Sequence, residues 1–468
     1  MNLNNYYAKN SINKCLTLNY LFVTSVVVIA AFYFGNNIIP AFSQELPSID
    51  DPSLKLDLVM DGLQSPTSMA FLTDNSILIT HKEGTISKLD LNAPTSLQPI
   101  LELNNVNSKN ERGLLGIAIN NNILGDTSRT GINQTGEFDA YVFVTETGTQ
   151  SGQEMQETTA VSSSNDELRN RVYKYTWNGE SLSNPKIILD LPVGPGTNHQ
   201  GGKVKIGPDN QLYTIVGELQ REGQLQNIND GPAPDDSGVI FRVDPSDGSP
   251  SNNNPFIEID DNTNSDNNPL SKYYAYGIRN SFGMDFDPVT GKLWNAENGQ
   301  DLYDEINLVE PGFNSGWKLV MGPISGSAGI TENDLVVFQG SKYAEPLLSW
   351  EQSRGVTDLE FFKSNGLGLK YENNIFVGDI TRGNLFFFEV NENRNGLQFN
   401  NNPDIANDLV VSTEDEISSI TLGSGFKGIT DIETGPDGDL YILTYSRADG
   451  GQGALYRISN NTETTSVS

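Results

Sequence analysis

The chain has very little cysteine and histidine. Its 468 residues include one cysteine, Cys15, and two histidines, His81 and His199. Because Cys15 lies in the N-terminal leader described below, the remaining chain can form neither a disulfide bond nor a thiolate metal site. A zinc site built on imidazole ligands would need more than two histidines. We therefore expect packing alone to hold the fold, with neither a cysteine nucleophile nor a histidine-ligated zinc ion.

Basic residues are also scarce. The chain has 29 lysines and arginines against 60 aspartates and glutamates, which gives a formal net charge of −31. No basic block is present that could neutralise a row of phosphates, so nucleic acid is not expected as a partner. The excess of acid favours solubility outside the cell and can attract cations.

One apolar run, residues 20–34, is the only candidate for a membrane segment. It is shorter than the roughly 20 residues that a spanning helix needs. Lys9 and Lys14 precede it, and residues 41–43 offer small side chains at the usual cleavage spacing. We expect residues 1–43 to be a signal peptide, so that the protein is extracellular or on the cell surface. The alternative is an uncleaved N-terminal anchor, which would be the only membrane contact.

Convincing helical periodicity is missing, and a repeated unit of extended segments takes its place. Each unit joins three strand-like segments by turns rich in Pro, Asp, Asn and Gly. Clear copies begin at residues 66, 201, 281 and 429, and blurred copies begin at residues 113 and 359. About six such units predict an all-β fold, a six-bladed β-propeller of four-stranded antiparallel blades, over residues 54–460. The segment 54–60 precedes the first copy, and we expect it to complete the last blade and close the ring.

The remaining stretches are polar. Residues 44–53 are expected to be a linker, and residues 461–468 a disordered tail. Three insertions interrupt the repeats, and each is either a functional loop or a tolerated excursion; they are residues 125–137, 147–165 and 230–269. Within the last one, the Asp- and Asn-rich stretch 260–268 lacks the spacing of an EF-hand, so we expect a solvated loop there and keep a calcium site as the alternative.

Candidate ligand contacts are the polar residues just before each inner strand, because these loops converge at one mouth of a propeller's channel. His199 lies in such a loop, in a glycine-rich turn, and Arg279 precedes the next clear copy. A neutral imidazole can take a proton from a hydroxyl while a guanidinium holds the negative charge that develops. The alternatives are that His199 hydrogen-bonds its own turn and that Arg279 forms an ion pair between blades. His81 is expected to fill a blade turn.

Several motifs occur in an order that resembles the glucose/sorbosone dehydrogenase family, the quinoprotein aldose sugar dehydrogenases. They begin at Glu111 (ERGLLG), Asn198 (NHQGG), Gly277 (GIRN), Glu297 (ENG) and Asp304 (DEIN). The resemblance implies a six-bladed propeller that binds pyrroloquinoline quinone and Ca²⁺. It also implies oxidation of an aldose C1 hydroxyl to the lactone, with electrons passed to an external acceptor.

The resemblance also implies roles for single residues. His199 matches the base, and Arg279 and Asn280 match a pair beside the quinone oxygens. The backbone carbonyls of Gly299 and Gln300 match calcium ligands. The other implied cofactor contacts are Asn298, Asp304, Thr381, Arg382 and Lys427, and the implied substrate contacts are Glu111, Asn198 and Trp350.

The chain departs from the family pattern where cations should hold the cofactor. Pyrroloquinoline quinone carries three carboxylates, and charge-assisted hydrogen bonds from cations bind such groups best. Relatives have a lysine where this chain has Thr381, and arginines near the position of Lys427. These departures predict a weaker quinone site. They leave two alternatives open: a non-catalytic propeller that binds a glycan or a protein partner, and a calcium-dependent hydrolase that resembles a lactonase.

Overall fold

The computed structural model of the protein describes residues 46–120, 138–147, 168–257, 268–400 and 402–461. The expected signal segment 1–43, the first insertion, nearly all of the second, residues 258–267 of the third and the tail from residue 462 lie outside the described residues. Leu46–Ser468 form one compact unit.

The unit is all-β, and its strands form six sheets. The first sheet contains β3 (Pro66–Thr73), β4 (Ser76–His81), β5 (Thr85–Asp90) and β6 (Leu97–Glu102). The second contains β7 (Leu114–Asn120), β8 (Phe138–Glu146), β9 (Arg169–Trp177) and β10 (Leu182–Leu191). The third contains β11 (Val204–Ile206), β12 (Leu212–Val216), β13 (Val239–Val243), β14 (Tyr273–Tyr276), β18 (Phe313–Asn314) and β19 (Lys342–Tyr343).

The other three sheets follow in chain order. The fourth contains β15 (Ser281–Phe286), β16 (Leu293–Glu297), β17 (Leu302–Val309), β20 (Leu348–Gln352) and β25 (Val410–Val411). The fifth contains β21 (Val356–Phe361), β22 (Ile375–Asp379), β23 (Leu385–Val390), β26 (Thr421–Ser424) and β1 (Ser48–Ile49), with β24 (Leu397–Gln398) beside β23. The sixth contains β27 (Ile429–Thr434), β28 (Leu440–Thr444), β29 (Gln452–Asn460) and β2 (Leu54–Gln64).

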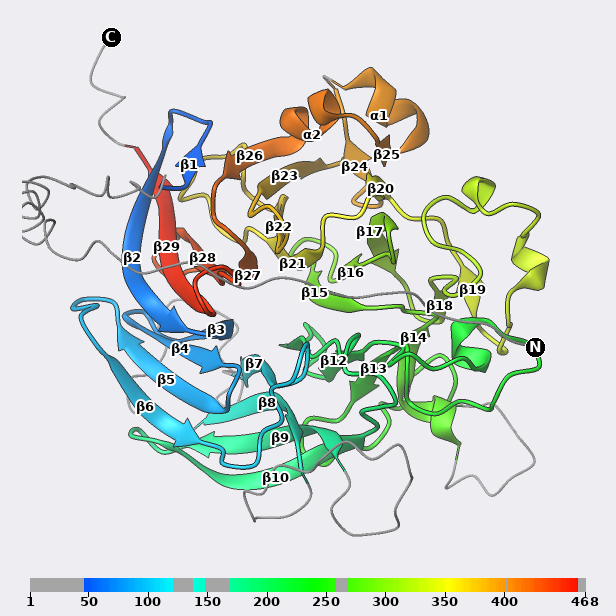
Figure 1. Cartoon of the computed structure of the whole chain (residues 1–468), viewed down its shortest axis with the longest axis horizontal. Coiled ribbons are helices and arrows are strands. Elements are labelled where there is room, and N and C mark those ends of the chain that lie inside the picture. Colours follow the sequence, from blue (N-terminus) through cyan, green and yellow to red (C-terminus); the bar gives the residue numbers. More distant parts are fainter. Residues whose placement is uncertain (1–45, 121–137, 148–167, 258–267, 401, 462–468) are drawn as a thin grey trace, which may run out of the picture. The chain divides into compact units, whose positions relative to one another are not determined.

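The sheets stand in turn around a common axis, as in a propeller (Figure 1). The inner strands are β3, β7, β11, β15, β21 and β27. Inner strands of successive sheets pack together, β3 against β7, β15 against β21, and β27 against β3, so the last sheet meets the first. Apolar and aromatic side chains fill the space between sheets; for example, the rings of Phe71 and Tyr441 are 5.0 Å apart between the first and sixth sheets. The expectation of an all-β, propeller-like arrangement is confirmed.

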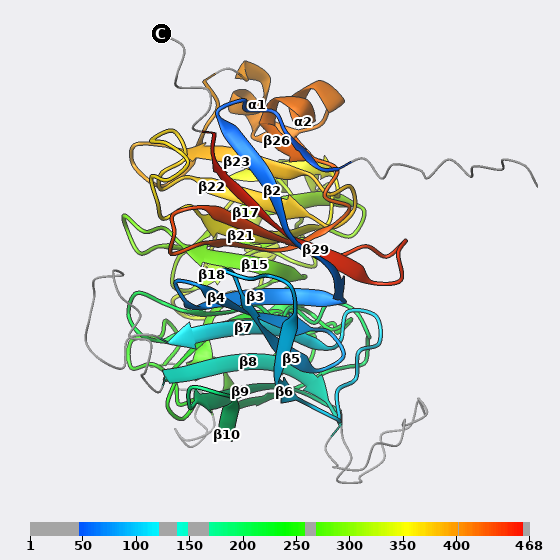
Figure 2. The same cartoon turned by 90° about the vertical axis from the view of Figure 1, so that its left-hand side faces the viewer.

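The N-terminal strand completes the C-terminal sheet, as its position in the sequence predicts. β2 pairs with β29 in antiparallel register from Leu54 opposite Asn460 to Gln64 opposite Gln452 (Figure 2). The expected linker 44–53 differs from the structure, because Ser48 and Ile49 form β1 and pair with β26. Ile49 packs against the apolar core between the fifth and sixth sheets, which explains why this short polar stretch is ordered.

Two short helices were not expected. They are α1 (Pro403–Asp408) and α2 (Glu414–Ile420), and a capping box of Thr413 and Glu416 begins α2. Helices of six and seven residues show too few turns to give a readable periodicity. Among the described residues, 3₁₀ turns also occur at Gln224–Gln226, Pro269–Lys272, Ile324–Gly326 and Glu332–Asp334. In the described part of the chain, no helix has the length and apolar character that crossing a membrane requires.

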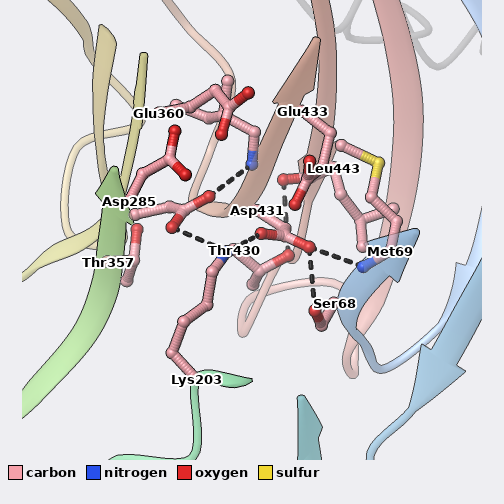
Figure 3. A network of polar contacts seen from close by, with 12 residues as sticks. Ser68, Met69, Lys203, Asp285, Thr357, Glu360, Thr430, Asp431, Glu433 and Leu443 are labelled. Carbon is pink, nitrogen blue, oxygen red and sulfur yellow. Dashed lines mark hydrogen bonds and ion pairs between the residues drawn. The ribbon is translucent and has the colours of Figure 1, made fainter. Parts of the chain in front are cut away.

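Charged side chains, which we call the axial network, join the inner strands near the axis (Figure 3). Its members are Lys203, Lys205, Asp285, Asp358, Glu360, Lys363, Asp431 and Glu433. Lys203 Nζ lies 2.8 Å from Asp358 and 2.5 Å from Asp431, and Asp431 also accepts from Ser68 Oγ at 2.9 Å. Most of these groups are buried, so their pairing offsets the cost of removing charge from water. The network thus connects the third, fourth, fifth, sixth and first sheets.

The axial network contains more carboxyl groups than ammonium groups. Three lysines face five acids, so not every buried carboxylate has a full positive partner. Burial, reinforced by the neighbouring charge of Asp285, raises the pKa of Glu360 to about 7. Burial likewise raises the pKa of Asp358 well above its ordinary value. The network therefore holds protons near neutral pH that an unfolded chain would release.

Candidate functional site

His199 lies in the loop between β10 and β11, with both ring nitrogens engaged. Nδ1 forms a hydrogen bond with the Glu218 carboxylate, and Arg279 Nη2 donates to Nε2 at 3.1 Å. An arginine can only donate, so Nε2 is the acceptor and Nδ1–H donates to Glu218. The partners thus assign the neutral tautomer with its lone pair on Nε2. This nitrogen can take a proton when Arg279 moves off it.

The backbone of His199 has an unusual conformation that is tied to two other loops. Its φ is +62°, in the left-handed region. The His199 N–H donates to Glu111 Oε2 at 2.5 Å, and the same oxygen accepts from Asn280 Nδ2 at 3.2 Å. These residues precede β7, β11 and β15. The prediction that loops far apart in sequence meet here is therefore confirmed, and Glu111 joins them.

Arg279 is the second centre of the candidate site. It is 7% exposed, and its Nη1 donates to the carbonyls of Asn298 at 2.9 Å and Gly299 at 2.7 Å. The guanidinium carbon lies 5.1 Å from the centroid of the Trp317 ring, in cation–π contact. Burial lowers the pKa of Arg279, and the carboxylates of Glu218 and other nearby acids oppose this effect. One guanidinium therefore joins the histidine to the loop after β16.

A pair of buried acids lies behind Arg279. Glu297 accepts from the Arg279 N–H at 2.6 Å and from the Ser315 hydroxyl at 2.8 Å, and Glu305 is its cross-strand partner. Burial raises the pKa of Glu297 to about 7, and burial together with the charge of Glu297 raises the pKa of Glu305 well above its ordinary value. Near neutral pH this pair therefore retains protons, and Glu297 fixes the backbone that carries Arg279.

Asp304 differs from its expected role as a cofactor contact. Its side chain is fully buried, and Oδ1 accepts from the Gly299 N–H at 2.9 Å and the Ser353 hydroxyl at 2.7 Å. Oδ2 accepts from the N–H groups of Arg354 at 2.6 Å and Gly355 at 2.7 Å. All these donors are protein groups, so Asp304 ties the loop after β16 to the loop before β21. It positions these loops and leaves no exposed atom for a ligand.

Trp350 also differs from expectation. Its side chain is 0% exposed, and its ring lies 5.3 Å from that of Phe386 and 5.9 Å from that of Phe388. It belongs to the apolar core between the fourth and fifth sheets. Alternation along β20 turns Trp350 into this core, while the next residue, Glu351, is exposed. The tryptophan at the candidate site is instead Trp317.

The residues expected to hold cofactor carboxylates lie on neighbouring loops. Thr381 and Arg382 are exposed between β22 and β23, and Lys427 is exposed before β27. Lys427 forms an ion pair with Asp449, and Arg382 Nη1 lies 3.5 Å from Glu414 Oε1. Both cations therefore already have an acidic partner.

The other predicted positions lie as follows. Asn198 is half-buried beside His199, and Asn280 is buried. The side chain of Asn298 is buried and donates to the Val356 carbonyl at 2.7 Å, while Gln300 is exposed. Away from the site, His81 shares a hydrogen bond of 2.6 Å with the Gln64 carbonyl, and burial lowers its pKa.

A calcium ion at Gly299 and Gln300 is poorly supported by this geometry. The Gly299 carbonyl already accepts from Arg279, so a cation placed there would lie close to a guanidinium. Among the described residues, no three His, Cys, Asp or Glu side chains are grouped to hold a metal. Calcium usually takes six to eight oxygen ligands. Backbone carbonyls and a bound anionic cofactor would therefore have to supply most of the ligands of a calcium ion here.

Two residues at the site, Glu218 and Trp317, are not among the candidates that the sequence predicts. Glu218 follows β12 by two residues, in the same segment that carries His199, and its position at a strand end was the available signal. Trp317 directly follows Gly316. Nothing in the sequence shows whether such a tryptophan stacks on a guanidinium or packs in the apolar core.

Comparisons with known proteins show which family and which proteins the chain resembles. A family model described as Glucose / Sorbosone dehydrogenase matches residues 63–457. The protein slr1608 of Synechocystis is 25% identical over 437 residues, with 90% of each chain covered. Aldose sugar dehydrogenase YliI of Escherichia coli is 26% identical over 274 residues, which cover 58% of this chain and 63% of that one. The PQQ-bound aldose sugar dehydrogenase of Streptomyces coelicolor matches in fold, with a TM-score of 0.58, 21% identity, and coverage of 88% of this chain and 100% of that one.

Proposed function

The chain belongs to the glucose/sorbosone dehydrogenase family, and on that premise we propose that it oxidises the C1 hydroxyl of an aldose sugar to the lactone. Pyrroloquinoline quinone is the proposed cofactor, and an external electron acceptor regenerates it. The observation that carries the proposal is the contact of His199 with Glu218 on one side and Arg279 on the other. The names of the Escherichia coli and Streptomyces relatives support the same class of reaction.

His199 is the proposed general base. The hydrogen bond from Nδ1–H to Glu218 keeps the lone pair on Nε2 and stabilises the imidazolium once Nε2 has taken the hydroxyl proton. Glu111 and Asn280 hold the loop so that the ring stays at the end of its strand. Because Glu218 holds the ring and Glu111 holds the backbone, the imidazole needs little reorganisation when the proton moves.

Arg279 is the proposed electrostatic partner. Its contact with His199 Nε2 must open before that nitrogen can accept a proton. An anionic ligand provides a reason for it to open, because a charge-assisted hydrogen bond to an anion is stronger than one to a neutral imidazole. Trp317 supports the guanidinium from the side and limits how far it can move.

The residues fit an anionic quinone better than a free metal ion. A buried guanidinium whose Nε has no hydrogen-bond partner offers positive charge and an unused donor. When bound, the quinone would supply the two-electron acceptor for the hydrogen that leaves C1. Calcium stays part of the proposal only as an ion that a bound anionic cofactor would help to hold.

We also propose that the protein is exported through residues 1–43 and works outside the cytoplasm. The six sheets are taken as the six blades of the propeller. The sugar and the electron acceptor are small partners at the loops before the inner strands, and no nucleic acid takes part.

The test is reconstitution of the purified protein with pyrroloquinoline quinone and calcium, followed by dye-linked oxidation of a panel of aldoses. Lactone formation that requires the quinone supports the proposal. A protein that binds no quinone at micromolar concentration contradicts it and favours the alternative of a propeller that binds a glycan or a protein. Activity with calcium alone would indicate the hydrolytic alternative.

A further inference from the structure

Arg354 is a buried cation near the candidate site to which the proposed reaction gives no role. It lies in the loop between β20 and β21, and it is 5% exposed. Its backbone N–H donates to Asp304, which also accepts from the Gly299 N–H. Since Gly299 accepts from Arg279, a short chain of hydrogen bonds connects Arg354 to the residues around His199.

The guanidinium of Arg354 is poorly satisfied. Nε and Nη1 are buried and have no hydrogen-bond partner, and Nη2 lies 3.5 Å from Glu414 Oε1, at the limit of a hydrogen bond. A buried donor without an acceptor typically costs about 1–3 kcal/mol, and more when it is charged. A folded protein retains such a group for a reason, and an anionic ligand that completes its hydrogen bonds is one.

A second arginine shares the same acid. Arg382 Nη1 also lies 3.5 Å from Glu414 Oε1, so one carboxylate oxygen lies between two guanidinium groups. The loops of the two arginines are in direct contact: a Cβ added to Gly355, whose φ is +69°, would lie 2.9 Å from Thr381 Oγ1. Glu414 itself is 69% exposed at the start of α2, where it can move away at little cost.

We propose that Arg354 and Arg382 together bind a carboxylate group of the ligand at this site, and that Glu414 occupies the arginine pair until the ligand carboxylate replaces it. Two arginines around one carboxylate allow several charge-assisted hydrogen bonds. On the proposed function, which this identification assumes, the ligand is pyrroloquinoline quinone. Arg354 then provides positive charge on the side where Thr381 stands in place of a cation.

The arginine pair explains how the chain can bind the cofactor although it has Thr381 where relatives have a lysine. A positive charge from the adjacent loop compensates for one absent from the turn between β22 and β23. The acid of α2 also gives the arginine pair a counter-ion, which keeps two neighbouring cations stable without the cofactor.

The test is a calorimetric titration of the full protein with pyrroloquinoline quinone in the absence of sugar, which measures the quinone affinity. Arg354→Gln should weaken binding at least tenfold, the effect of one lost charge-assisted hydrogen bond. Glu414→Gln should tighten binding several-fold, because a competing carboxylate is removed. Arg457→Gln is the matched control, since Arg457 on β29 has loose acidic partners at 3.6 and 3.7 Å and should bind like the wild type.

Binding by Arg354→Gln within twofold of the wild type overturns the inference, as does a Glu414→Gln protein that binds no tighter. Arg354→Lys keeps the positive charge but loses the two-pronged guanidinium. Its quinone affinity should lie between those of the wild type and Arg354→Gln, and it serves as a second variant should Arg354→Gln fail to fold. If the wild type binds no quinone, the proposed function fails, and benzene-1,2,4-tricarboxylate then serves as the probe. Binding of that probe that is lost in Arg354→Gln supports the arginine pair, and no binding by the wild type overturns it.

Discussion

Arg279 donates a hydrogen bond to Nε2 of His199 at 3.1 Å, on the nitrogen that the proposed reaction needs as its base. The same guanidinium holds the Asn298 and Gly299 carbonyls through Nη1. The resting arrangement therefore keeps the base nitrogen occupied, and ligand binding at Arg279 and proton transfer at His199 are coupled.

Nitrogen NMR can test the contact between Arg279 and His199 directly, because the chain has only two histidines and their ring-nitrogen resonances can be told apart. We expect His199 to show the tautomer with the proton on Nδ1 and an Nε2 resonance shifted by its hydrogen bond. Arg279→Ala should move that Nε2 resonance towards the position of a free acceptor. The ring of His81, which is buried and bonded to Gln64, is the internal control and should not shift. An unchanged His199 spectrum would show that the contact does not exist in solution.

Glu218 should set the efficiency of the base without touching the sugar. In Glu218→Gln the amide oxygen can still accept from Nδ1–H, but the negative charge that stabilises the imidazolium is lost. We expect kcat to fall by about 10–100-fold while the quinone affinity stays within twofold. Steady-state kinetics and a quinone titration on one preparation measure both. A loss of quinone affinity equal to the loss of kcat would mean that Glu218 acts on the cofactor site.

Trp350 should matter for stability alone. Trp350→Ala removes a fully buried ring between the fourth and fifth sheets, and we expect it to lower the free energy of unfolding by about 3–5 kcal/mol. Urea unfolding followed by circular dichroism measures this loss. The protein that remains folded should bind quinone and sugar as the wild type does. A stable Trp350→Ala protein with weakened sugar binding would restore the role that the sequence suggested.

The axial network should make stability depend on pH. The folded-state pKa of Glu360, raised to about 7, lies above its ordinary value of 4.5, so the stability that its proton contributes is present below about pH 4.5 and lost as the pH rises through 7. The Gln side chain of Glu360→Gln is neutral at every pH. As the pH rises from 4.5 through 7, we therefore expect the free energy of unfolding of this variant to fall by roughly 1–3 kcal/mol less than that of the wild type. Urea unfolding at pH 4.5, 6 and 8 measures the difference. Glu351→Gln, at an exposed position of β20, is the control, and identical pH profiles for all three proteins would contradict the expectation.

The repeated strand–turn–strand units make most of the fold predictable from the sequence. Strand–turn–strand units with Pro-Asp-Gly turns, as at Pro436, predict a sheet from local sequence alone. The position of the segment around Leu54 then predicts which sheet it must complete. The short helices and the pairing of Ser48 and Ile49 could not be read in the same way, because long-range packing and not local propensity orders them.

The sequence predicts only part of the candidate site, and the reason is physical. The loops that meet at His199 could be named, because topology brings them together. Whether a side chain there faces a ligand or the interior is set by its packing, which one sequence does not show. The family resemblance implies ligand contacts for Asp304 and Trp350, yet both side chains are buried. Arg354 lies just before an inner strand, where ligand contacts are expected, but nothing in the sequence singles it out, because an arginine whose hydrogen bonds are incomplete looks in sequence like any surface cation.

The central claim is that His199 removes the proton from the sugar hydroxyl. Rapid mixing of the quinone-loaded protein with an aldose, with the reduction of the quinone followed by absorbance, tests it most directly. The account predicts that His199→Asn binds the quinone as the wild type does but reduces it about 10²–10⁴-fold more slowly, the usual contribution of a general base. Reduction by His199→Asn at the wild-type rate would contradict the account.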